Sequence, residues 1–118
     1  MQARREMELT LASLGKYAQS LSVADGLLRD GAPFEDLYFQ KGYALMKMGR
    51  EEDARRAYEE SVRKNPGFPE AYFHLGLLQM KSRRWPQAAV FFEKAFDIKP
   101  EPRYSEMLEK ARSAGSSQ

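Results

Sequence analysis

The side chains that can do chemistry are few in this chain, and they do not gather into a catalytic or metal-binding pattern. His74 is the single histidine and cysteine is absent, so a metal site would need carboxylates alone beside that imidazole, and none cluster there. The acidic run Glu51, Glu52 and Asp53 suits the start of a helix, where negative charge is stabilising. The sequence has no phosphate-binding glycine loop and no nucleophile motif. We therefore expect no enzyme activity, no cofactor and no metal, and a surface or hydrogen-bonded role for His74.

A basic group, Lys81, Arg83 and Arg84, lies beside Trp85 and raises the question of nucleic acid. Positive charge is also favourable at the end of a helix, which is the simpler explanation here. The whole chain has 19 basic and 17 acidic residues, for a net charge of +2. This balance does not indicate a nucleic-acid-binding protein.

The elements that position these residues repeat every 34 residues. Tyr38, Phe39 and Gly42 return as Tyr72, Phe73 and Gly76, and the segments 35–68 and 69–102 share nine identical positions. Apolar residues at helical spacing, interrupted by turn residues, predict helix pairs at 35–48 and 51–64, and at 69–82 and 86–98. The same period predicts helices at 1–14 and 18–30, and a seventh helix at 103–113 follows Pro102.

The organisation that follows is a single domain over residues 1–113. We expect repeats at 1–34, 35–68 and 69–102, a capping helix at 103–113 and a flexible tail at 114–118. No segment has the pattern of a strand.

The repeated positions resemble the tetratricopeptide repeat family over residues 1–102. The aromatic residue of the first helix matches Tyr38 and Tyr72, and the small residue at the helix contact matches Gly42 and Gly76. Further matches lie in and after the second helix: Ala54 and Ala88, Tyr58 and Phe92, Ser61 and Ala95, Pro66 and Pro100. The resemblance implies an all-α fold, a right-handed superhelical stack of three helix hairpins with a seventh C-terminal helix.

The first repeat departs from this pattern. Arg4 stands where the aromatic residue belongs, Glu8 where the glycine belongs and Ala32 where the proline belongs. A charge in a close helix contact must lose its water. We therefore expect this hairpin to pack more loosely, or its first helix to be rotated or shifted in register.

Each first helix carries a second apolar line beside the one that a hairpin needs for packing. By the family resemblance, this second line faces a concave groove that holds peptides. The predicted groove residues are Leu9, Phe39, Tyr43, Met46, Phe73, Leu77 and Met80, and the predicted edge residues are Gln40, Lys47, His74 and Lys81.

The function expected from this groove is protein–protein interaction, by a scaffold or chaperone that binds an apolar peptide or an amphipathic helix. One alternative is a chaperone for a hydrophobic secreted protein, similar to the three-repeat chaperones of bacterial type III secretion. A second alternative is self-assembly into a homo-oligomer. In a third, the second apolar line is part of the hydrophobic core and binds no ligand. The family's carboxylate clamp for heat-shock chaperones is not expected, because its positions carry Arg5, Leu9, Gln40, Glu70 and His74.

The sequence has no apolar run long enough to span a membrane, and its first residues lack the apolar run of a signal peptide. A cytoplasmic location is the default expectation. The chain enters its first predicted helix almost at once, which is typical of a fragment of a longer protein.

Overall fold

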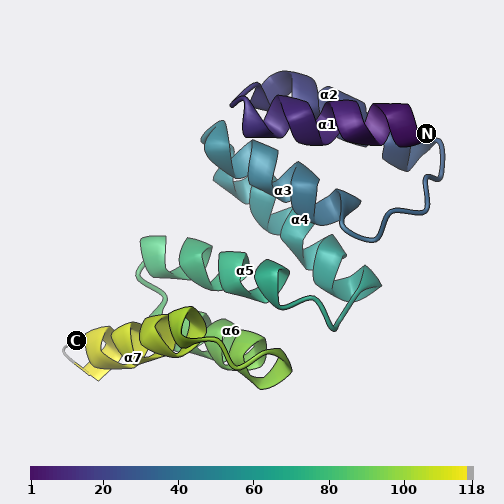
Figure 1. The fold of residues 1–118 in the computed structure, drawn as a ribbon. Helices are drawn as coiled ribbons and strands as arrows, with labels where there is room; N and C mark the ends of the chain where they lie inside the picture. Colours follow the sequence, from purple (N-terminus) through teal and green to yellow (C-terminus); the bar gives the residue numbers. More distant parts are fainter. Residues whose placement is uncertain (117–118) are drawn as a thin grey trace. The chain divides into compact units, whose positions relative to one another are not determined.

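The computed structural model describes residues 1–116, and these residues form helices joined by short turns (Figure 1). No strand occurs in this part of the chain. The all-α fold expected from the sequence is confirmed. The helices are α1 Gln2–Ser13, α2 Tyr17–Arg29, α3 Leu37–Lys47, α4 Glu51–Lys64, α5 Pro69–Lys81, α6 Trp85–Ile98 and α7 Pro102–Ser116.

The helix ends follow from local chemistry. The turns after α1 and α3 each contain a glycine with positive φ, Gly15 at 76° and Gly49 at 81°, a conformation that glycine adopts without a steric penalty. Proline lies in the first turn of α5 and of α6, where its missing N–H costs no helical hydrogen bond. The predicted helix at 103–113 extends to Ser116, so residues 114–116 of the expected tail are helical, and residues 117 and 118 lie outside the described part.

The helices divide into two compact units, Met1–Lys64 with α1–α4 and Asn65–Gln118 with α5–α7. In the first unit each helix packs on the next along the chain. The α3–α4 contact is close because Gly42 lies against the ring of Tyr58, which is completely buried. A Cβ atom at Gly42 would lie 2.7 Å from that ring, so the glycine is needed for the contact.

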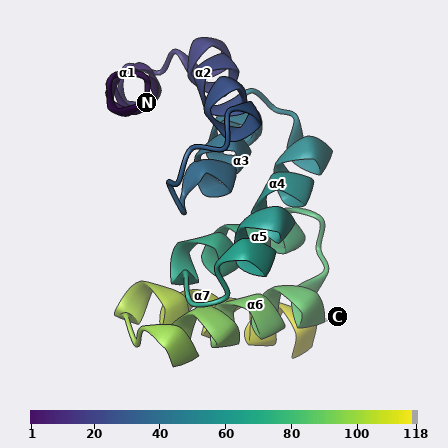
Figure 2. The same cartoon turned by 90° about the vertical axis from the view of Figure 1, so that its right-hand side faces the viewer.

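The second unit repeats this device and adds a helix. A Cβ atom at Gly76 of α5 would lie 2.5 Å from the buried ring of Phe92 in α6. Helix α7 then packs along α6, as both views of the ribbon show (Figures 1 and 2). Phe92, Leu108 and the alanines Ala88 and Ala111 form the core of this unit.

The first hairpin packs differently: α1 and α2 contact each other less extensively than α3 and α4 or α5 and α6 do, in line with the looser packing expected from the sequence. Glu8 occupies the place of Gly42 and has an exposed fraction of 0%. On α2, Ala24 stands 34 residues before Tyr58, so the large side chain comes from the first helix and the small one from the second. The Ser20 hydroxyl donates a hydrogen bond of 3.1 Å to the Glu8 carboxylate. The hairpin thus stays closed with its large and small positions exchanged.

Candidate functional site

Helix α3 carries three of the four predicted groove residues of the first unit, and these three lie together. Phe39, Tyr43 and Met46 are spaced by four and three residues and are all half-buried. The rings of Phe39 and Tyr43 stack with their centres 6.5 Å apart. Tyr17, at the start of α2, meets Tyr43 edge to face at 6.1 Å. These four side chains, which we call the α3 stripe, form a continuous, mainly aromatic patch with part of its surface open to solvent.

The α3 stripe also contributes to the hairpin beneath it. Tyr58 of α4 lies 5.6 Å from Phe39, centre to centre, and its hydroxyl donates to the Met46 sulfur at 3.9 Å. Burial raises the pKa of Tyr58 well above its usual range, and the nearby Tyr43 adds to the shift. Tyr58 therefore stays neutral at physiological pH and holds the inner side of the stripe in place.

Other predicted residues of the first unit lie at more exposed positions. The ammonium of Lys47 lies 5.4 Å from the centre of the Tyr43 ring, so this cation borders the stripe. Gln40 is half-buried on the same helix, and Leu9 of α1 has an exposed fraction of 39%. A part for Leu9 in the site stays a prediction.

The predicted groove residues of the second unit, Phe73, Leu77 and Met80, all pack against its core. Phe73 lies 5.7 Å from Phe92 and 5.1 Å from Tyr104, between ring centres. Packing against α6 and α7 is therefore enough to explain why these three positions of α5 are apolar, without a ligand. A ligand contact through the surface that remains is still a prediction.

A polar cluster at the edge of the second unit ties α7 to α5. The Tyr104 hydroxyl donates a hydrogen bond of 2.7 Å to Glu70, and the Arg103 guanidinium also pairs with Glu70. His74 Nε2 lies 3.9 Å from the same carboxylate. Glu70 is therefore engaged within the chain, and Lys81, the other predicted edge residue, is exposed at the end of α5.

Among the carboxylate-clamp positions, Arg5 is likewise engaged in internal contacts. Arg5, the one suitable cation among them, pairs with Asp36 and lies 3.5 Å from the Glu8 carboxylate. Its guanidinium also lies over the Phe34 ring at 5.1 Å. A ligand carboxylate would have to compete with two internal ones for this arginine.

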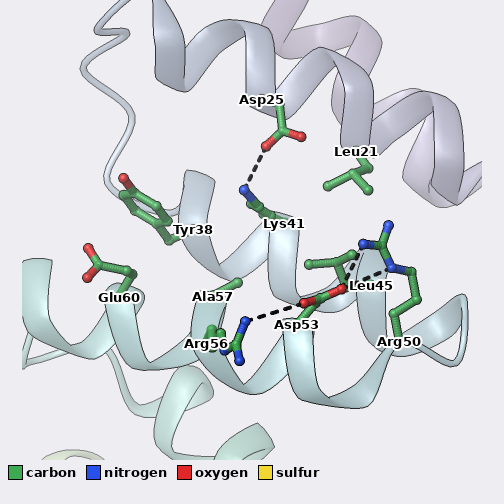
Figure 3. A pocket seen from close by; sticks show the side chains of 10 residues that line it. All are labelled: Leu21, Asp25, Tyr38, Lys41, Leu45, Arg50, Asp53, Arg56, Ala57 and Glu60. Atoms are coloured by element: carbon green, nitrogen blue, oxygen red, sulfur yellow. Dashed lines mark hydrogen bonds and ion pairs between the residues drawn. The ribbon is translucent and has the colours of Figure 1, made fainter.

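A pocket that the sequence did not indicate lies among α2, α3 and α4, with a volume of about 320 Å³ (Figure 3). Its apolar part includes Leu21 and Leu45, while Lys41 pairs with Asp25 at 2.9 Å across the rim. Tyr38 also lines it, although this residue was expected to serve helix packing. The one signal in the sequence was Lys41, a charge on the face of α3 that carries Tyr38 and Leu45.

The buried carboxyl group of Glu8 is the titratable feature that stands out. Loss of water on burial raises its pKa, the hydrogen bond from Ser20 and the charge of Arg5 act in the opposite direction, and Asp36 adds to the rise. Its contacts with Ser20 of α2 and with Arg5 make it part of the packing of the first hairpin. Within residues 1–116, no three His, Cys, Asp or Glu side chains lie close enough to hold a metal ion.

Comparisons with known proteins place the chain in a family. Residues 39–101 match the family model described as tetratricopeptide repeat, which is more than half of the sequence. Tetratricopeptide repeat protein 6 of Homo sapiens is 33% identical over 57 residues, 48% of this chain. A TPR repeat-containing protein of Methanocaldococcus jannaschii is 35% identical over 60 residues, 51% of this chain. The chain belongs to the tetratricopeptide repeat family, and the matched parts span only 11% of each of these two longer relatives.

Solved structures show the same fold at low identity. The type III secretion chaperone SycD of Yersinia enterocolitica, in complex with a peptide of the translocator YopD, has a TM-score of 0.86 at 17% identity. That match covers 94% of this chain and 91% of SycD. The first TPR domain of Spaghetti (RPAP3), bound to an HSP90 peptide, also scores 0.86, at 18% identity, covering 98% and 92% of the two chains. Among the described residues, no helix has the length and apolar character needed to cross a membrane.

Proposed function

We propose that this protein is a non-catalytic protein–protein interaction module that binds an apolar peptide or an amphipathic helix on the α3 stripe. The observation that carries the proposal is the half-buried patch of Phe39, Tyr43 and Met46 beside Tyr17, part of whose surface is open to solvent. Aromatic and methionine side chains gain free energy when a ligand covers them, and methionine adapts to ligands of different shape. Lys47, over the Tyr43 ring, adds a cation at the border of the patch.

Family membership and two similar structures support the proposal. SycD and the RPAP3 domain both hold peptides, and both share the fold at the same TM-score. Because the two bound peptides come from unrelated partners, the likeness supports peptide binding in general and does not favour a secretion chaperone. Leu9, Gln40 and the second-unit residues Phe73, Leu77, Met80, His74 and Lys81 remain predicted contacts, and a cytoplasmic location remains a prediction.

The test is a selection of peptides from a random displayed library against the whole chain, followed by affinity measurements with one selected peptide. We expect Tyr43→Glu to weaken binding at least about tenfold, because the new charge must lose water when the peptide covers it. Tyr38→Glu is the matched control, because Tyr38 is another half-buried tyrosine of α3 and the substitution is the same. Tyr38 lines the pocket of Figure 3 and does not belong to the α3 stripe. The affinity of this variant should stay within about twofold of the unchanged chain, since position 38 is not part of the α3 stripe and a peptide bound to the stripe need not cover the new charge.

Circular dichroism and thermal unfolding of both variants decide how the affinities are interpreted. If Tyr43→Glu unfolds the chain, Met46→Gln on the same stripe takes its place. Equal losses in the Tyr38 and Tyr43 variants, or no loss in either, would exclude the α3 stripe as the binding surface. Sedimentation velocity of the same variants tests self-association, because a dimer that dissociates only in Tyr43→Glu would assign the stripe to a second copy.

A further inference from the structure

The turn between α5 and α6 concentrates positive charge on the surface of the second unit. Lys81, Arg83 and Arg84 are all exposed, and they lie within four consecutive residues. Trp85 follows directly, half-buried at the start of α6. Within residues 1–116, neither Arg83 nor Arg84 has an ion-pair partner, whereas most other arginines do, for example Arg4, Arg50, Arg55 and Arg63.

The backbone of this turn shows that an arginine occupies a position made for glycine. Arg83 has a φ of 58°, and the residues 34 and 68 positions earlier are Gly49 and Gly15, with φ of 81° and 76°. The turn hydrogen bonds are the same: Arg83 N–H donates to Met80 at 3.0 Å, as Gly49 N–H donates to Met46 at 3.0 Å. A side chain in this left-handed region is disfavoured sterically. Within the described residues, the Arg83 side chain makes no hydrogen bond or ion pair that would offset this cost.

The equivalent turn of the first unit carries its own anions. There, Arg50 donates to Asp53 at 2.7 Å and 3.1 Å, and the first turn of α4 is acidic. In the second unit, Arg84 stands at the position of Arg50, but Gln87 replaces Asp53 and the first turn of α6 contains no acidic residue. The α5–α6 turn thus lacks the internal carboxylates of the α3–α4 turn and carries one more arginine, Arg83.

We propose that the α5–α6 turn is a binding surface for an acidic segment of a partner protein, with Arg83 and Arg84 pairing with its carboxylates. A guanidinium donates two parallel hydrogen bonds to a carboxylate, and no internal ion pair has to break before these two can do so. Single-stranded nucleic acid fits less well, because it is held by an extended basic groove with exposed aromatic rings, and Trp85 is half-buried. The proposal concerns another unit and another ligand chemistry than the α3 stripe and does not depend on it.

Trp85 supplies the assay, since it is the only tryptophan of the chain and adjoins Arg84. The whole chain is titrated with an oligoglutamate peptide, and with an oligoglutamine peptide of equal length, while Trp85 emission and the heat of binding are followed. We expect saturable binding of oligoglutamate alone, weakened by added salt. Arg84→Gln should weaken it several-fold to about tenfold, as loss of a charge-assisted hydrogen bond does.

Two variants separate the site from general charge and from misfolding. Arg29→Gln, at another exposed arginine with no ion-pair partner in the described part, removes the same charge from the first unit and should change the affinity by less than about twofold. Arg83→Gly should weaken binding while keeping the fold, because glycine is the residue of the two equivalent turns.

Three results would overturn the proposal. The first is the absence of saturable oligoglutamate binding at low salt, and the second is an equal loss of affinity in Arg29→Gln and Arg84→Gln. The third is tighter binding of a thymidine oligonucleotide of matched charge that depends on Arg83 and Arg84, which would assign the turn to nucleic acid.

Discussion

Replacement of a single hydrogen by a methyl group should have opposite effects at two buried glycines. At Gly76 the new Cβ would lie 2.5 and 2.7 Å from the ring of Phe92, which is completely buried and lies 5.7 Å from the ring of Phe73, centre to centre. At Gly26 the nearest atom is the Arg29 guanidinium at 3.6 Å, an ordinary contact with a flexible side chain. Both positions are inside helices, where alanine is preferred to glycine by about 1 kcal/mol.

The magnitudes follow from these distances. Overpacking of a rigid core costs about 1–3 kcal/mol, and the severe overlap at Gly76 lies at the upper end, so the net loss after the helix preference is about 1–2 kcal/mol. Gly26→Ala has no such cost and should add about 0.5–1 kcal/mol. Urea unfolding followed by circular dichroism measures both changes, and the corresponding shifts of Tm are about 4 °C per kcal/mol.

A second substitution separates overlap from other causes. Phe92→Leu destabilises the chain by itself, but in the Gly76→Ala background it also makes room for the methyl group. The double variant should therefore be more stable than the sum of the single changes by about 1 kcal/mol. If Gly76→Ala is as stable as Gly26→Ala, the ring can withdraw and the explanation of the glycine by close helix contact is refuted.

Three further changes test other parts of the structure. Because burial raises the pKa of Glu8, the free energy of unfolding should fall as pH rises above its ordinary pKa of 4.5, and Glu8→Gln should remove this slope in urea titrations across pH. Arg83→Gly should raise the free energy of unfolding by about 0.5–1 kcal/mol, measured as a higher Tm. Glycine removes the steric cost of a left-handed arginine in the folded state, and the larger entropy of glycine in the unfolded state offsets part of this gain. Glu70→Gln should lower the stability by about 1 kcal/mol by weakening the contacts with Tyr104 and Arg103, and hydrogen exchange should locate the added opening in α7.

The 34-residue period predicted the helices well because it records a physical requirement at each helix contact. At positions 42 and 76 only glycine fits against the rings of Tyr58 and Phe92. The 34-residue spacing of Gly42 and Gly76 therefore located two hairpins in the sequence. The sequence showed that Glu8 departs from the repeat pattern, but it did not show how the first hairpin accommodates this side chain. Ala24 stands at the position that Tyr58 and Phe92 occupy in the other hairpins, and it is buried. That a small residue there leaves room for Glu8 is evident only when the two helices are considered together.

The proposed binding surface was harder to predict, because a half-buried apolar line has the same sequence pattern whether a ligand or another helix covers it. On α3 the line keeps part of its surface open, as Tyr43 shows. On α5 the equivalent line contacts α7 through Phe73 and Tyr104, and α7 does not follow the 34-residue period, so the repeat could not indicate this contact. The left-handed conformation of Arg83 was likewise hidden in the sequence, and the structure shows it through the φ of 58°.

The exchange of large and small residues in the first hairpin limits how this protein can be recombined. A chimera that joins α1 to α4 would bring Glu8 against Tyr58, two large side chains in one contact. The reverse chimera, α3 with α2, would leave Gly42 facing Ala24 and a void about the size of a ring. The two hairpins are therefore not interchangeable building blocks. Shuffling or consensus design in this chain has to treat each hairpin as one inherited pair of helices.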